Sequence, residues 1–169
     1  RLNIQPISTI QTLGGSGRPL YFRNSLTMNT NPLLDTSGLP RFDTITPEQV
    51  APAIGSLLEE TRALVERLTA DNVPANWSDF AAPLSNGIEK LSRAWGIVGH
   101  LHSVNDIPAW REAYNVMLPE VSRFYAELGQ NLRLFSKYKI ILERADFACL
   151  TPEQQRIIAN EVRDFRLSG

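Results

Sequence analysis

Few residues of this chain have both the types and the spacing that chemistry requires. His100 and His102 are the only histidines, and two residues apart on a helix they point about 200° away from each other. They therefore cannot hold one metal ion together, as histidines four residues apart do in a His-Glu-x-x-His helix. We predict instead that one of them is a partly buried polar group between two helices.

Cys149 is the only cysteine, so the chain cannot form an internal disulfide and nothing indicates an oxidising compartment. It lies beside Phe147 and Leu150 with no histidine near it in the sequence, and we interpret it as a small buried side chain rather than a nucleophile. Several acidic residues lie among arginines and lysines on expected helix faces, where solvated surface is the default: Glu59, Glu60, Glu112, Glu120 and Glu127. From these patterns we assign no catalytic, cofactor-binding or metal-binding residue.

Composition limits the classes of partner. The 169 residues are 43% hydrophobic and 21% charged, which is typical of a soluble globular protein. A net charge of −1 gives no electrostatic reason to expect nucleic acid or an anionic membrane as a partner. No apolar run approaches the roughly 20 residues that a membrane-spanning helix needs. We therefore expect neither nucleic acid nor a membrane among the partners.

Helical periodicity predicts an all-α fold of long antiparallel helices. The segments Thr46-Pro47-Glu48-Gln49 and Thr151-Pro152-Glu153-Gln154 both have the capping chemistry of a helix start, with proline in the first turn. The first opens a helix whose apolar stripe runs from Val50 to Leu68. The second opens a final helix after an expected loop, and its stripe is Ile157, Ile158, Val162 and Phe165.

Between Ser78 and Tyr138 we expect two long helices that fold back on each other at Asn105-Asp106, and we take this pair as the centre of the fold. Asp106 is a suitable cap for the second helix, and Pro119 predicts a kink within it. Large side chains at steps of three and four predict one buried stripe on each helix. The stripes are Phe80, Leu84, Ile88, Leu91, Trp95, Val98 and His102, then Trp110, Tyr114, Met117, Val121, Phe124 or Tyr125, Leu128, Leu132 and Phe135.

The first 27 residues differ from the rest of the chain. They contain three arginines and no acidic residue, so they carry a charge of +3, and they show no helical period. We interpret them as a disordered tail or translated flanking sequence, with an organelle transit peptide as the alternative. Met28 is the first methionine, and we expect the helical domain to occupy residues 28–169.

Several short segments match a known family in order and spacing. They are Asn31-Pro32-Leu33-Leu34, Leu39-Pro40-Arg41-Phe42, Ile45-Thr46-Pro47-Glu48, Trp95-Gly96-Ile97-Val98-Gly99-His100-Leu101, Arg111-Glu112-Ala113-Tyr114, Leu118-Pro119-Glu120-Val121-Ser122, Leu128-Gly129-Gln130-Asn131 and Arg163-Asp164-Phe165-Arg166-Leu167-Ser168-Gly169. Through them, residues 28–169 resemble the N-terminal region of the thimet-oligopeptidase family of zinc metallopeptidases.

The resemblance implies a larger two-lobed helical fold around a channel that admits short peptides. In this family a His-Glu-x-x-His helix and a downstream glutamate hold zinc, and this chain contains no such motif. The family places the motif beyond the position of Gly169. We therefore expect a structural segment of a cytoplasmic zinc metalloendopeptidase that hydrolyses short peptides, inactive alone and packed against a C-terminal catalytic lobe. The alternative is a stand-alone helical protein-interaction module without catalytic activity.

Overall fold

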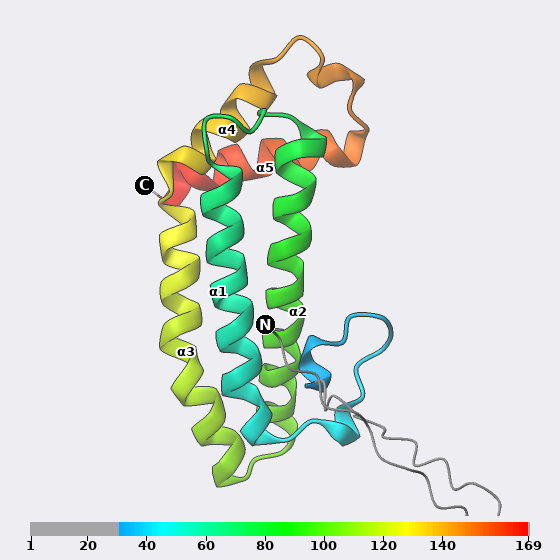
Figure 1. The fold of residues 1–169 in the computed structure, drawn as a ribbon, viewed down its shortest axis with the longest axis vertical. Coiled ribbons are helices and arrows are strands. Elements are labelled where there is room, and N and C mark those ends of the chain that lie inside the picture. Colours follow the sequence, from blue (N-terminus) through cyan, green and yellow to red (C-terminus); the bar gives the residue numbers. More distant parts are fainter. Residues whose placement is uncertain (1–30, 169) are drawn as a thin grey trace, which may run out of the picture.

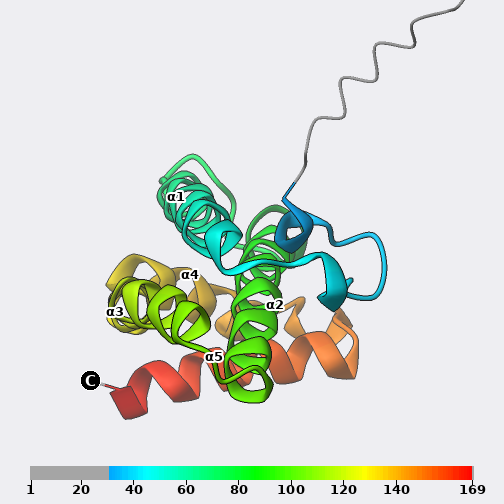
Figure 2. The same ribbon diagram turned by 90° about the horizontal axis from the view of Figure 1, so that it is seen from below.

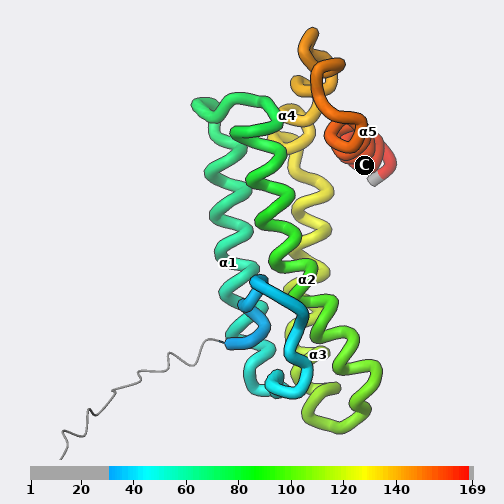
Figure 3. Tube along the Cα trace, turned by 90° about the vertical axis from the view of Figure 1, so that its right-hand side faces the viewer, coloured from blue at the N-terminus to red at the C-terminus, as the bar shows by residue number. Residues whose placement is uncertain are grey.

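Three long helices form an upright antiparallel bundle in the computed structural model, which describes residues 31–168 (Figure 1). They are α1 (Val50–Leu68), α2 (Ala82–Val104) and α3 (Pro108–Gly129). Seen along the bundle, the three helices occupy the corners of a triangle (Figure 2). Helix α4 (Leu132–Glu143) continues beyond α3, and α5 (Pro152–Ser168) lies across the end of the bundle (Figure 3).

Every regular element from residue 31 to residue 168 is helical, which confirms the predicted all-α class. The interpretations of residues 1–27, of Met28 and of Gly169 lie outside the described residues. Within those residues, no helix is both long enough and apolar enough to cross a bilayer.

Both predicted Thr-Pro-Glu-Gln helix starts are confirmed by their hydrogen bonds. The backbone N–H of Thr46 donates to Gln49 Oε1 at 2.9 Å, and that of Thr151 donates to Gln154 Oε1 at 3.0 Å. At Thr46 the first turn is the 3₁₀ helix Pro47–Gln49, which leads directly into α1. Side-chain oxygens thus accept hydrogen bonds from backbone N–H groups that have no acceptor within the helix.

The lead-in to α1, from Asn31 to Thr46, contains the 3₁₀ helices Pro32–Leu34 and Phe42–Thr44. Asn31 anchors its first turn, because its side chain accepts from Leu33 N at 3.1 Å and donates to the Gln49 carbonyl at 2.7 Å. Leu33 is only 2% exposed. The lead-in is therefore packed against the start of α1.

Helix α1 contacts both α2 and α3, and the three share the first core. Gly87 of α2 brings α1 close, because a Cβ at this position would overlap the Leu64 side chain. The predicted stripe of α1 is buried except for Leu64, which is half-buried. The buried members of the first core are Leu33, Ile45, Val50, Ala53, Ile54, Leu57, Leu58, Leu91, Ala94, Ile97, Val98, Leu101, Trp110, Met117, Val121 and Phe124.

A second core joins the other end of the bundle to α4 and α5. Phe80 and Tyr138 meet edge to face, with their ring centroids 5.0 Å apart. Ile157 was predicted to lie in the buried stripe of the final helix, but it is 38% exposed and does not belong to this core. The buried members are Val65, Leu68, Phe80, Ala81, Leu84, Leu134, Tyr138, Ile141, Ile158 and Val162.

Helix α4 also fixes the turn that follows α1. The Lys137 ammonium donates to the carbonyl oxygen of Ala70 at 2.9 Å and to that of Val73. Both acceptors lie beyond the end of α1, so a side chain of α4 supplies a hydrogen-bond donor to backbone groups outside a regular helix.

The prediction of one helix from Asp106 to Tyr138 is wrong, because it breaks at Gln130-Asn131. Asn131 Oδ1 accepts from Arg133 N at 3.0 Å and from Leu134 N at 3.2 Å, which starts α4 as a separate helix. This capping competes with continuation of the α3 hydrogen bonds. As a result Leu132 is 77% exposed and does not lie in the predicted stripe.

The prediction that Asp106 caps the second of the two long helices is wrong. The cap position of α3 is Ile107, whereas Asp106 forms an ion pair with Arg111 at 3.3 Å. A π-helical turn, Trp77–Ala81, precedes α2, and Asn76 caps it by accepting from Asp79 N at 2.7 Å. The regular helix α2 thus starts after Ser78, at Ala82. Helix α3 runs through Pro119, and the kink there stays a prediction.

We predict that Phe80→Ala lowers the free energy of unfolding of the 169-residue chain by about 3–5 kcal/mol, because it opens a cavity beside Tyr138 in the second core. Urea unfolding followed by tryptophan fluorescence measures this change. Phe42→Ala is the matched control, since Phe42 is 42% exposed and its loss should cost less than about 1 kcal/mol. Equal losses in the two variants would contradict the assignment of Phe80 to a packed core.

Candidate functional site

The two histidines lie in different surroundings on α2. His100 is exposed, and its ring contacts Phe42 with centroids 5.2 Å apart. His102 is half-buried and stacks on Tyr114 at 4.3 Å, while Tyr114 also stacks on Trp95 at 4.8 Å. The prediction of one partly buried histidine between two helices is confirmed, and His102 is that residue.

Cys149 is exposed, so the prediction of a small buried side chain is wrong. It ends the 3₁₀ helix Phe147–Cys149 in the connection between α4 and α5. Phe147 and Leu150 take the inward positions of this connection and pack against the second core. The hydrophobic neighbours of Cys149 led to the prediction of burial. In the structure these neighbours are partly buried and the cysteine between them is not.

Zinc does not fit the described residues. Among residues 31–168, no three His, Cys, Asp or Glu side chains gather in a group that could hold a metal ion. The two histidines lie against different aromatic side chains, His100 against Phe42 and His102 against Tyr114.

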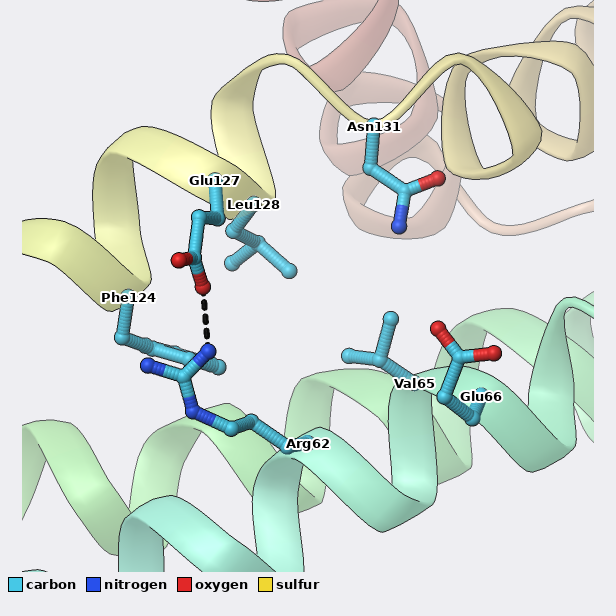
Figure 4. A pocket seen from close by; sticks show the side chains of 7 residues that line it. All are labelled: Arg62, Val65, Glu66, Phe124, Glu127, Leu128 and Asn131. Carbon is cyan, nitrogen blue, oxygen red and sulfur yellow. Dashed lines mark hydrogen bonds and ion pairs between the residues drawn. The ribbon is translucent and has the colours of Figure 1, made fainter.

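A groove between α1 and α3, beside the break before α4, combines charged and apolar side chains (Figure 4). We call it the α1–α3 groove. It has a volume of about 310 Å³. Its lining residues are Arg62, Val65, Glu66, Phe124, Glu127, Leu128 and Asn131.

The charged groups of the α1–α3 groove are paired with one another or with a neighbour. Arg62 forms an ion pair with Glu127 and lies over the Phe124 ring, 5.4 Å from its centroid. Glu66 pairs with Arg133 of α4 at 2.5 Å. The groove lining contains no hydroxyl, thiol or imidazole, and its two carboxylates, Glu66 and Glu127, are held in ion pairs. Its ion pairs connect α1 to α3 and to α4.

These cross-helix pairs were missed from the sequence. Glu127 is exposed as predicted, but its partner Arg62 lies 65 residues earlier. Glu66 and Arg133 are 67 residues apart. No local spacing rule connects residues at such separations, and only the packing of the helices brings them together.

One carboxyl group, that of Glu161 in α5, has a raised pKa. Burial raises the pKa of Glu161 in α5, and the charge of Asp164 raises it further. Burial also raises the pKa of the Tyr138 phenol, with an added contribution from the Glu161 charge. An ionised Glu161 is therefore less stable in the folded chain than in water.

We predict a coupling free energy of about 0.2–1 kcal/mol between Arg62 and Glu127, because both side chains are partly exposed to solvent. A double-mutant cycle with Arg62→Met and Glu127→Gln measures it by urea unfolding of the 169-residue chain. The coupling should decrease at high salt, since salt screens exposed charges. A coupling that is zero at low salt would show that the ion pair does not brace α1 against α3.

We predict that Glu161→Gln stabilises the chain at neutral pH. Because its folded pKa is raised, Glu161 binds its proton more tightly in the folded than in the unfolded chain. The free energy of unfolding of the natural chain, relative to the Gln variant, therefore falls as the pH rises from about 4.3 through the raised pKa.

Urea unfolding at about pH 4 and about pH 7 should give a larger difference between Glu161→Gln and the natural chain at the higher pH. Glu59→Gln, at an exposed position on α1, is the matched control. A natural chain that is more stable than Glu161→Gln at neutral pH would contradict the prediction.

Comparison with known proteins connects this framework to a family. A family model described as the N-terminal domain of neurolysin and thimet oligopeptidase matches residues 54–169. Oligopeptidase A of Salmonella typhimurium is 37% identical over 140 residues, which cover 83% of this chain and 21% of that protein. Oligopeptidase A of Escherichia coli is 38% identical with the same coverage.

A plant relative agrees with the bacterial ones. The probable cytosolic oligopeptidase A of Arabidopsis thaliana is 34% identical over 143 residues, which cover 85% of this chain and 20% of that protein. The chain thus spans about a fifth of the length of these curated relatives. Its predicted resemblance is confirmed, and the chain belongs to the neurolysin and thimet oligopeptidase family, in which it corresponds to the N-terminal domain.

Proposed function

We propose that this chain is the N-terminal helical segment of a metalloendopeptidase that hydrolyses short peptides. The observation that carries the proposal is the match to oligopeptidase A over 83% of the chain, which is only 21% of the relative's length. Residues 28–169 would form the N-terminal region of a larger two-lobed helical protein, and residues 1–27 would stand outside it.

In this proposal the catalytic zinc belongs to the C-terminal lobe of the same protein. The described residues offer no set of three metal ligands, and the charged groups of the α1–α3 groove are committed to ion pairs. The contribution of this segment is architectural. A braced helical bundle can form one wall of a channel that admits short peptides and excludes folded proteins.

We propose the cytoplasm as its location, with short peptides and the catalytic lobe as partners. The name of the plant relative, a probable cytosolic oligopeptidase A, supports this location. The near-neutral charge of the chain supports the proposal that neither nucleic acid nor a membrane is a partner.

We predict that the protein expressed from the full reading frame around this chain cleaves a short quenched-fluorescence peptide. A chelator should abolish cleavage and added zinc should restore it, because metal peptidases lose their activated water with the metal. The 169-residue chain, assayed alone with the same zinc, should show no cleavage.

Two results would contradict this proposal. Cleavage that is insensitive to the chelator would reject the metallopeptidase. A reading frame without a catalytic lobe, giving a protein that binds a partner but cleaves nothing, would favour the stand-alone helical interaction module.

A further inference from the structure

A second groove lies where α3 ends, α4 begins and the last turns of α5 pass. We call it the α5 groove. Phe135 and Phe165 both line it, with ring centroids 5.7 Å apart. It has a volume of about 350 Å³, and its lining residues are Gly129, Gln130, Leu132, Phe135, Phe165 and Arg166.

The α5 groove differs from the α1–α3 groove in its chemistry. Its walls are mainly aliphatic and aromatic, whereas the α1–α3 groove contains an ion pair. Leu132, which lines the groove, is 77% exposed. Leu167, which follows the lining residue Arg166 in α5, is 78% exposed. Arg166 forms no hydrogen bond or ion pair with any other residue from 31 to 168. The groove therefore offers apolar surface and a cation to a segment that binds there.

The end of α5 indicates what covers this groove. Phe165 and Arg166 lie in the last turn of α5, which ends at Ser168. Figure 1 shows this end of the chain beside the junction of α3 and α4. A polypeptide that continues past α5 therefore starts at the edge of the groove. The relatives are about five times as long as the matched region, which corresponds to an N-terminal domain.

A tethered segment also fits the small size of the groove. A stable interface between separate proteins uses about 20–30 residues on each side, and the groove is lined by far fewer. A segment of the same chain binds at a high effective concentration, so it needs much less contact area than a free partner.

We propose that the α5 groove is the docking site for the stretch of polypeptide that directly follows α5 in the full-length protein. This segment places apolar side chains against Leu132, Phe135 and Phe165 and a carboxylate beside Arg166. The inference rests on the proposed function, because it requires a chain that continues beyond this domain.

The first test introduces a thiol by Leu132→Cys in a Cys149→Ser background, in both the full-length protein and the 169-residue chain. The thiol should react with a maleimide at least about tenfold more slowly in the full-length protein, because docking covers it. The matched control is Leu39→Cys in the same background. Leu39 is 92% exposed in the lead-in at the opposite end of the bundle, and its labelling checks the reagent and the fold of each protein.

Equal labelling rates at position 132 in the two proteins would overturn the proposal. Protection already present in the 169-residue chain, and lost on dilution, would show that a second copy fills the groove and would also overturn it. Leu132→Glu gives an independent measurement. It should lower the thermal midpoint of the full-length protein and leave that of the 169-residue chain unchanged, and an equal effect on both would overturn the proposal.

The peptide-cleavage assay separates this proposal from the function on which it rests. A full-length protein that protects position 132 but cleaves no peptide would keep the docking site and reject the peptidase. A protein that cleaves peptides while position 132 stays reactive would reject the docking site alone.

Discussion

Burial of the apolar stripe of α1 is the constraint on which the rest of this structure depends. Its first half, from Val50 to Leu58, lies in the first core, and Val65 and Leu68 lie in the second. Two polar side chains on and just beyond α1 are also buried, Thr61 and Thr69. Their hydroxyls donate to the carbonyls of Leu57 at 2.6 Å and Val65 at 2.9 Å. One helix can therefore join both cores without leaving a buried polar group unpaired.

The parts of the fold that were predicted from the sequence depend on local chemistry. The starts at Thr46 and Thr151 use hydrogen bonds between residues three apart, and the stripes use the helical period. The break at Asn131 was missed because its neighbours have a continuous apolar period, which concealed the local cap. The exposure of Cys149 depends on which residues of one short connection turn inward, and periodicity does not determine this.

Even less of the candidate site than of the fold could be predicted from local sequence. Its ion pairs join residues that are more than sixty positions apart, so they follow from helix packing and from no motif. No pattern in the sequence indicated a catalytic constellation, and the α1–α3 groove contains charged groups that serve as braces. The functional interpretation therefore comes from family membership, while the structure shows how the helices of such a segment are held together.

The bonds from Lys137 to the turn after α1 have a consequence for the order of folding. The carbonyls of Ala70 and Val73 receive this ammonium from 67 and 64 residues further along the chain. By contrast, α1 and α2, and α4 and α5, are neighbours in sequence that pack together. Contacts between sequence neighbours close short loops and form early. We expect the turn after α1 to gain its amide protection later than α1 and α2, which pulsed hydrogen exchange during refolding would detect.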